Sequence, residues 1–84
     1  MTQDEVFEQV VKILTPHVKN QAALDSIAPE TNILDDLKVN SARLVDVVLA
    51  FEDDFNIEIP DEDVDGVNTV GDCVRLVLEK LQSS

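Results

Sequence analysis

The 84-residue sequence lacks tryptophan and tyrosine and contains one cysteine, one histidine and two glycines. Because only one cysteine is present, the chain cannot form an internal disulfide or a multi-cysteine zinc site. The lone His17 likewise provides no basis for a histidine-containing catalytic triad or a facial metal triad. The aromatic side chains are three phenylalanines, so stacking on bases or sugars is not expected. No apolar run approaches the roughly 18 residues needed to cross a bilayer, so we expect no membrane insertion.

Positive charge is also scarce, because six Lys and Arg residues stand against eighteen Asp and Glu residues, for a net charge of −12 and a pI near 4.1. Such a chain has no electrostatic attraction to nucleic acid or anionic lipid, and partner proteins with basic patches are the expected class. Residues 1–8 are polar and acidic, unlike a secretory signal. Together with the single cysteine, this predicts a reducing, cytoplasmic location. We expect one monomeric domain over residues 1–84.

Apolar spacing predicts an all-α fold, a bundle of three main helices plus one short helix. The main helices are expected over residues 2–15, 41–55 and 70–81, and the short acidic helix over residues 61–67. A long loop, residues 16–40, is expected between the first and second helices, with a turn or two of helix at 21–28.

Two apolar groups predict how these elements pack. Val45, Val47 and Leu49 widen the apolar face of the second main helix, which predicts that neighbours cover it on several sides. Within the long loop, Leu34 and its neighbours Ile33 and Leu37 are apolar enough to hold the loop on the core.

Asn40 and Ser41 stand where the long loop meets the second main helix. If Asn40 is the N-cap, Ser41 is the first helical residue, and its hydroxyl points outward at the positive end of the helix dipole. A phosphate ester would be stabilised there by backbone N–H groups. Alternatively, Ser41 is itself the N-cap, which is the commoner role of a serine before an apolar helix. Spacing alone leaves both interpretations open.

Three stretches of the chain together match a family pattern: residues 35–41, residues 44–55, and the run Ile57-Glu58-Ile59-Pro60-Asp61-Glu62-Asp63, with Val70 beginning the last helix. With these stretches, nearly the whole chain resembles an acyl carrier protein. In that family, a serine of a D-S-L motif at the start of the second helix carries 4′-phosphopantetheine, and acyl groups are held on the terminal thiol. Ser41 occupies that position. The resemblance therefore implies a carrier, not an enzyme, that is modified by a phosphopantetheinyl transferase and serves fatty-acid, lipid or related biosynthesis.

The immediate surroundings of Ser41 depart from the family pattern. Asn40 replaces the usual Asp, Ala42 the usual Leu, Lys38 a common Gly, and Arg43 a residue that is often acidic. The charge beside the attachment position is thus less negative than the resemblance implies. We expect a specialised carrier whose partner choice these residues alter. A polyketide or peptidyl carrier is one alternative, and a divalent-cation-binding or protein-interaction domain on the same fold is another.

The resemblance also implies two surfaces. The acidic edge of the second helix and the segment after it would dock basic patches on acyl-processing enzymes. The expected partner-binding residues are Asn40, Arg43, Asp46, Glu52, Asp53, Asp61 and Asp65. A cleft between the second and third helices would shelter the acyl chain, because each buried methylene contributes roughly 0.8 kcal/mol. The expected lining residues are Val45, Val48, Leu49, Phe51, Val64 and Val67.

A calcium-loop pattern competes for some of the same acids. Asp61, Asp63, Asp65 and Asp72 match the ligand spacing of an EF-hand loop, with Asp in place of the usual final Glu. Pro60 argues against an entering helix, so we expect no dedicated metal site and treat these four residues as a weaker alternative. Cys73 lies on an apolar helical face, which predicts a buried structural residue rather than a redox thiol.

Overall fold

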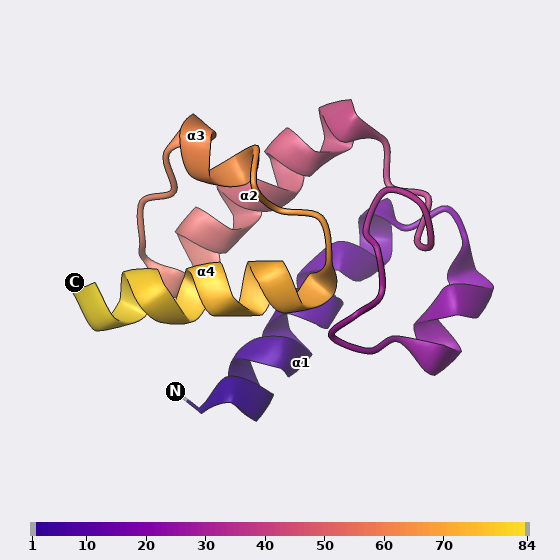
Figure 1. The fold of residues 1–84 in the computed structure, drawn as a ribbon, viewed down its shortest axis with the longest axis horizontal. Coiled ribbons are helices and arrows are strands. Elements are labelled where there is room, and N and C mark those ends of the chain that lie inside the picture. The colour runs from indigo at the N-terminus through magenta and orange to yellow at the C-terminus, as the bar shows by residue number, and fades with distance from the viewer. Residues whose placement is uncertain (1, 84) are drawn as a thin grey trace.

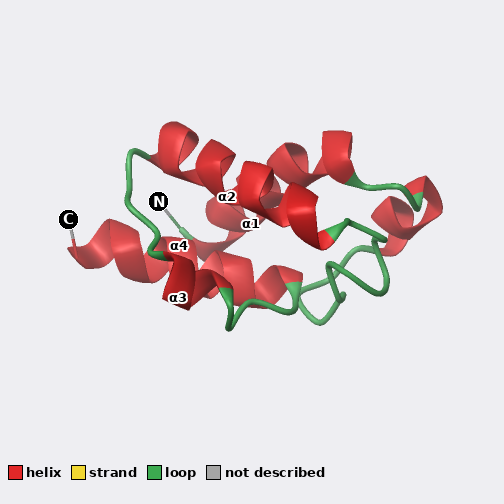
Figure 2. Cartoon of the chain, turned by 90° about the horizontal axis from the view of Figure 1, so that it is seen from above, coloured by secondary structure: helices red, strands yellow, loops and turns green. Residues whose placement is uncertain are grey.

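The computed structural model describes residues 2–83 and contains helices and loops (Figures 1 and 2). The elements in chain order are α1 (Gln3–Leu14), the 3₁₀ helices η1 (Thr15–His17) and η2 (Gln21–Ser26), α2 (Ser41–Phe55), α3 (Asp61–Val64) and α4 (Val70–Ser83). Within the described residues there is no strand, and pairing is limited to an isolated bridge between Asn32 and Thr69. The predicted all-α bundle of three main helices and one short helix is confirmed. No helix of residues 2–83 has the length and apolar character that crossing a bilayer requires.

Local sequence accounts for both ends of α1. Thr2 is the N-cap, and its side chain and that of Glu5 each accept a hydrogen bond from the other residue's backbone N–H, at 3.2 and 3.1 Å. This reciprocal capping lowers the pKa of the Glu5 carboxyl. At the other end, Pro16 lies in η1, since it lacks the N–H that would continue the α-helical pattern.

Most buried core residues of the described chain come from the three long helices, and valine is the commonest type among them. α1 packs most extensively on α4 and also contacts α2. Phe51 of α2 is the largest fully buried side chain, and its ring lies 6.4 Å from that of Phe55, centroid to centroid. The other fully buried side chains are Val6, Val10, Leu14, Ile33, Leu37, Val47, Val70 and Val77.

The long connection is bound to the start of α4 by backbone hydrogen bonds. The Ile33 N–H donates to the Asn68 carbonyl at 2.9 Å, and the Val70 N–H donates to the Thr31 carbonyl at the same distance. Gly71 N–H donates to the Pro29 carbonyl at 2.8 Å, and a Cβ at Gly71 would lie 2.9 Å from that same oxygen. Glycine is therefore required for this close approach. In Figure 1 the connection lies at the end of the molecule where α2 begins, opposite the last turns of α4.

Three apolar residues are less buried than the sequence predicts. Val45 and Leu49 on α2 are each 57% exposed, and Leu34 in the connection is 37% exposed. The expectation that neighbours cover α2 on several sides is therefore wrong for Val45 and Leu49, which lie opposite the face that carries Val47 and Phe51. Ile33 and Leu37 hold the connection on the core as expected.

The short acidic helix is shorter than predicted. α3 ends at Val64 rather than Val67, because the Asp65 and Gly66 N–H groups donate within a closing turn, to Asp61 and Asp63. Val67 is nevertheless buried, so the chain after α3 still packs on the core. α3 itself makes fewer contacts with the other elements than the long helices make with one another.

Cys73 is buried, at 3% exposure, as its place on the apolar face of α4 predicts. Burial raises the pKa of the Cys73 thiol to about 12, and the neighbouring Asp72 charge adds to the effect. At neutral pH the side chain is therefore a protonated, unreactive thiol.

Asp72 organises the start of α4. Its carboxylate accepts hydrogen bonds from the Asn68 and Thr69 N–H groups at 3.0 and 3.1 Å, and its own N–H donates to the Thr69 hydroxyl. Arg75 contacts the other carboxylate oxygen at 2.6 Å. These backbone hydrogen bonds, more than the Arg75 contact, lower the pKa of the Asp72 carboxyl.

Asp72→Ala is expected to lower the free energy of unfolding at neutral pH by about 1 kcal/mol, because two backbone donors at the helix start lose their acceptor. Since the folded-state pKa is lowered, this contribution is present above the unfolded-state pKa of about 3.9 and is lost as the pH falls through the folded-state value. Urea unfolding across this range should show wild type and variant converging at low pH. Glu58→Ala, which removes an exposed carboxylate from a loop, is the control; an equal loss in that variant would contradict the capping role.

Candidate functional site

The N-terminus of α2 agrees with the interpretation in which Asn40, and not Ser41, is the N-cap. Asn40 has extended backbone angles, φ −65° and ψ 140°, and its side-chain oxygen accepts a hydrogen bond from the Ala42 N–H at 2.8 Å. Asn40 is therefore the N-cap, and Ser41 is the first residue of the helix. Ser41 is exposed, and its hydroxyl is not used in capping. This leaves an accessible nucleophilic oxygen at the positive end of a 15-residue helix.

The backbone amides of this first turn are mostly occupied. The Arg43 and Leu44 N–H groups both donate to the Asn40 carbonyl, at 2.8 and 3.1 Å. With Ala42 bound by the cap, the amide of Ser41 itself is the one without a hydrogen-bond partner in the described chain. A phosphate ester on Ser41 would thus meet one free amide of the first turn rather than the several that the sequence suggests.

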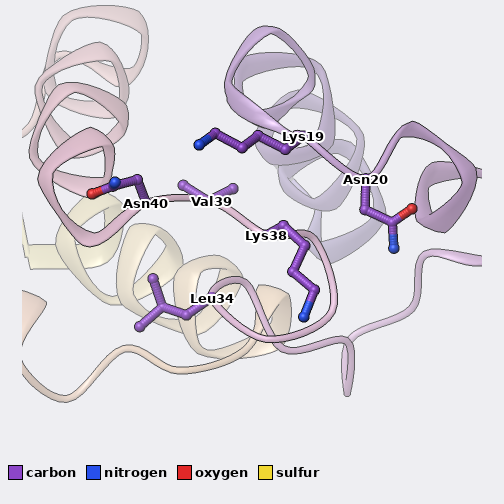
Figure 3. Close-up of a pocket in the computed structure, with 6 residues that line it drawn as sticks. All are labelled: Lys19, Asn20, Leu34, Lys38, Val39 and Asn40. Carbon is purple, nitrogen blue, oxygen red and sulfur yellow. The ribbon is translucent and has the colours of Figure 1, made fainter.

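A groove opens directly before Ser41. It has a volume of about 550 Å³ and is lined by Lys19, Asn20, Leu34, Lys38, Val39 and Asn40. We call it the Lys19–Lys38 groove. Figure 3 shows the Lys19 side chain extending past Val39 toward Asn40 and the start of α2, with Leu34 on the other side of Val39. The groove therefore combines two cations with apolar surface next to the candidate attachment residue.

Hydrogen bonds between distant parts of the connection hold the walls of this groove together. The Asn20 N–H donates to the Leu37 carbonyl at 3.2 Å, and the Asn20 side-chain amide donates to the Asp36 carbonyl at 3.0 Å. The Val39 N–H donates to the Ile33 carbonyl at 3.1 Å. Lys38 between them has φ 59°, in the left-handed region that favours glycine.

The cations near Ser41 differ in how they point. Lys19 and Lys38 line the groove and Arg43 lies two residues after Ser41, but Figure 3 shows the Lys19 side chain extending toward Asn40 and the Lys38 side chain pointing away from it. None of the three forms an ion pair within the described residues, and Arg43 in particular does not pair with Asp46. The sequence places Lys38 and Arg43 near Ser41 but gives no sign that Lys19 and Asn20 are also its neighbours, because only the folded connection brings them next to α2. Leu34 was expected to hold the loop on the core, not to line a groove before Ser41.

The predicted partner-binding acids are mostly accessible. Asp46 and Asp53 are exposed on α2, and Asp61 and Asp65 are exposed in and after α3. Glu52 is the exception, because it is half-buried and its carboxylate accepts a hydrogen bond from the Ile59 N–H at 3.2 Å. Glu52 thus has a role in holding the loop after α2.

The residues expected to line an acyl cleft divide into two groups. Val48, Phe51 and Val67 are buried and Val64 is half-buried, so these four remain a prediction for a cleft at α2 and α3. Val45 and Leu49 are exposed, away from the core. For these two residues, too, a place in the acyl cleft stays a prediction.

The four acids of the calcium-loop pattern do not converge. The Asp72 carboxylate is occupied by the start of α4 and by Arg75, and the Asp63 carboxylate pairs with Lys80 at 2.8 Å. This pairing raises the pKa of the Lys80 ammonium. Among the described residues, no group of three or more His, Cys, Asp or Glu side chains is placed to hold a metal ion. The weaker alternative of a metal site at Asp61, Asp63, Asp65 and Asp72 is therefore wrong for this structure.

Comparison with known proteins gives the same picture. A family model described as "Phosphopantetheine attachment site" matches residues 17–77. The chain is 37% identical over 76 residues to an acyl carrier protein of Picosynechococcus, a match that covers 90% of this chain and 91% of the relative. It is also similar to the solved structure of a thermally stable acyl carrier protein from Enterococcus faecalis, with a TM-score of 0.77 and 36% identity, over 95% of this chain and 99% of that one.

These similarities extend over the connection, α2, α3 and most of α4, the part of the chain that builds the Ser41 site. Members of the matched family bear a phosphopantetheine cofactor, carry acyl groups on it, and are carriers rather than catalysts. From its matched residues, its relatives and its fold, the chain belongs to the acyl carrier protein family.

Proposed function

We propose that the 4′-phosphopantetheine arm of this carrier is attached to the hydroxyl oxygen of Ser41. The observation that carries this proposal is the division of roles at the start of α2, where Asn40 caps the helix and Ser41 is exposed with its hydroxyl outside the cap. When bound, the arm supplies a terminal thiol that holds acyl groups as thioesters. The protein supplies position and recognition.

The residues around Ser41 fit a phosphate ester at this position. The free Ser41 amide can donate to a phosphate oxygen, and the positive end of α2 favours the negative charge. Lys19, Lys38 and Arg43 add positive charge in a chain that is otherwise strongly acidic. Because Ser41 projects from the surface, a modifying enzyme can reach it without opening the bundle.

The attachment site is tested by modifying the protein with coenzyme A and a broad-specificity phosphopantetheinyl transferase. Intact mass should increase by one phosphopantetheine group, and fragmentation of the modified peptide should place that mass on Ser41. Mass added to Ser26, which is exposed in η2, or no added mass would overturn the proposal.

We further propose that α2 presents the docking face for partner enzymes. Asp46, Leu49 and Asp53 follow one another at i, i+3 and i+7, and Val45 lies beside them, so acidic and apolar groups share the exposed side of the helix. Asp61 and Asp65 extend the acidic surface beyond α2. A partner with a basic rim around an apolar contact is complementary to this face, while an acidic group near its active-site entrance would suit Arg43.

Charge reversal on this face is expected to slow modification by a transferase with a basic docking surface. Asp53→Lys should reduce the second-order rate several-fold at low salt, and the difference from wild type should shrink as salt screens the charges. Asp54→Lys makes the same charge change on an exposed residue that lies off the Asp46–Asp53 side of α2. Equal rates for the two variants would contradict docking through this face.

We place this carrier in the cytoplasm as a monomer. Its single cysteine is buried and cannot form an internal disulfide, which suits a reducing compartment. The partners that we assign to it are the phosphopantetheinyl transferase and the acyl-processing enzymes that load, modify and receive its acyl chains.

A further inference from the structure

Apart from the positive charge of its two lysines, the Lys19–Lys38 groove has no role in the proposed attachment or in the proposed docking face. Its lining residues Lys38, Val39 and Asn40 lead directly into Ser41 along the chain. A group linked to the Ser41 oxygen and turned back along the chain would therefore reach this groove. The groove is open to solvent and has a volume of about 550 Å³.

The chemistry of the groove matches the successive parts of a phosphopantetheine arm. The arm begins with an anionic phosphodiester, continues through a segment with two methyl groups, and then contains two amides. Figure 3 shows Lys19 extending toward the start of α2, where the phosphate would be, with Val39 and Leu34 following. Leu34, 37% exposed, offers apolar surface, and Val39 forms a buried floor.

Polar groups for the amides are also present. The Asn40 side-chain oxygen is used in the cap, while its amide nitrogen has no protein partner in the described chain. Asn20 donates through its side-chain nitrogen to Asp36 and leaves its side-chain oxygen available. One donor and one acceptor therefore line the same groove at separate positions.

Given attachment at Ser41, on which this inference rests, we propose that the Lys19–Lys38 groove is a resting site for the phosphopantetheine arm. Lys19 attracts the phosphate, Leu34 and Val39 contact the methyl-bearing segment, and Lys38 lines the groove farther from Asn40 (Figure 3). In this resting position the arm lies against the connection, and it leaves the groove when a partner on α2 takes up the acyl group. Charge supports this placement, because Lys38 and Arg43 flank Ser41 in sequence and Lys19 extends toward the start of α2 in a chain with net charge −12.

The test compares apo and holo protein by NMR, with intact mass measured first on the same samples. The holo protein should show shifts at Lys19, Leu34 and Val39 and nuclear Overhauser effects from the arm methyl groups to the Leu34 and Val39 methyl groups. A holo protein whose shifts are confined to residues 40–43, or whose arm contacts Val64 and Val67 instead, would overturn the resting site while leaving attachment intact. Absence of the added mass would overturn attachment and the resting site together.

Matched variants distinguish an effect of the groove cations from an effect of the protein's overall charge. Lys19→Gln combined with Lys38→Asn removes both cations, and asparagine tolerates the left-handed backbone of residue 38. In this double variant the nuclear Overhauser effects between the arm and Leu34 should weaken at least twofold at low salt. Lys12→Gln removes an exposed cation from α1, away from the groove, and should leave these effects unchanged. Equal weakening by the two changes would show that the groove cations do not hold the arm.

Discussion

Ser41→Ala is expected to abolish attachment of the phosphopantetheine arm completely while leaving the fold intact. Alanine lacks the oxygen that forms the phosphoester, so no modified species should form. The fold should tolerate the change because Asn40, not Ser41, caps α2, and because Ser41 is exposed. Alanine is the best helix former, so the free energy of unfolding should change by no more than about 0.5 kcal/mol.

Intact mass and a thermal melt on the same sample measure both parts of this prediction. Ser26→Ala is the matched control, because it removes the hydroxyl of an exposed serine in η2 and should leave modification at the wild-type level. An arm that is still added to the Ser41→Ala protein would place the attachment elsewhere. A cooperative melt close to that of wild type would show that loss of the arm is chemical and not caused by unfolding.

Phe51→Ala is expected to produce the largest loss of stability among single substitutions, about 3–5 kcal/mol. Phe51 is 2% exposed, and it is the largest fully buried side chain of the core, in contact with Phe55. Removing its ring loses the transfer free energy and leaves a cavity that the surrounding core fills only in part. Domains of this size have a total stability of roughly 5–15 kcal/mol, so the variant should be partly unfolded near physiological temperature.

Urea unfolding measures this loss, and Leu49→Ala is its control on the same helix. Leu49 lies two residues from Phe51 but is 57% exposed, so its truncation should cost less than about 1 kcal/mol. A comparable loss in both variants would mean that Leu49 is covered in solution, which would contradict its assignment to the docking face.

The helices and the proposed attachment position follow from local sequence, and the structure explains why. Asn40 can cap α2 with its own side chain, and Pro16 ends the first α-helix by lacking an N–H, so both boundaries depend on single residues. Ser41 could be interpreted in two ways from sequence because serine and asparagine both cap helices well. The hydrogen bond from Ala42 to Asn40 decides between them.

The packing of α2 was less predictable, because apolar spacing does not show which neighbours are present. Val45 and Leu49 have the residue type of a core position, but no element packs over their side of the helix. The groove beside Ser41 could not be predicted from the sequence for a different reason. It depends on hydrogen bonds from Asn20 to Asp36 and Leu37, between segments with no shared periodicity.

In the calcium-loop pattern, by contrast, residue spacing suggests a site that the structure does not form. Asp72 stands at the expected spacing from Asp61 in the sequence, but its carboxylate accepts hydrogen bonds from the Asn68 and Thr69 amides just before α4. The backbone donors at the helix start are close to Asp72 in sequence. Its carboxylate therefore binds these donors and does not join the distant acids in a metal site. Asp63 is similarly engaged by Lys80.

The burial of Cys73 determines how this carrier can be observed and handled. With its only cysteine protonated inside α4, the apo protein offers no reactive sulfur to solvent. Once the arm is attached, its terminal thiol is the sole accessible one, so a thiol-specific reagent counts the molecules that bear an arm free of an acyl group. A labelled maleimide would therefore mark the end of the arm and nothing else, and oxidation could couple two carriers only through their arms.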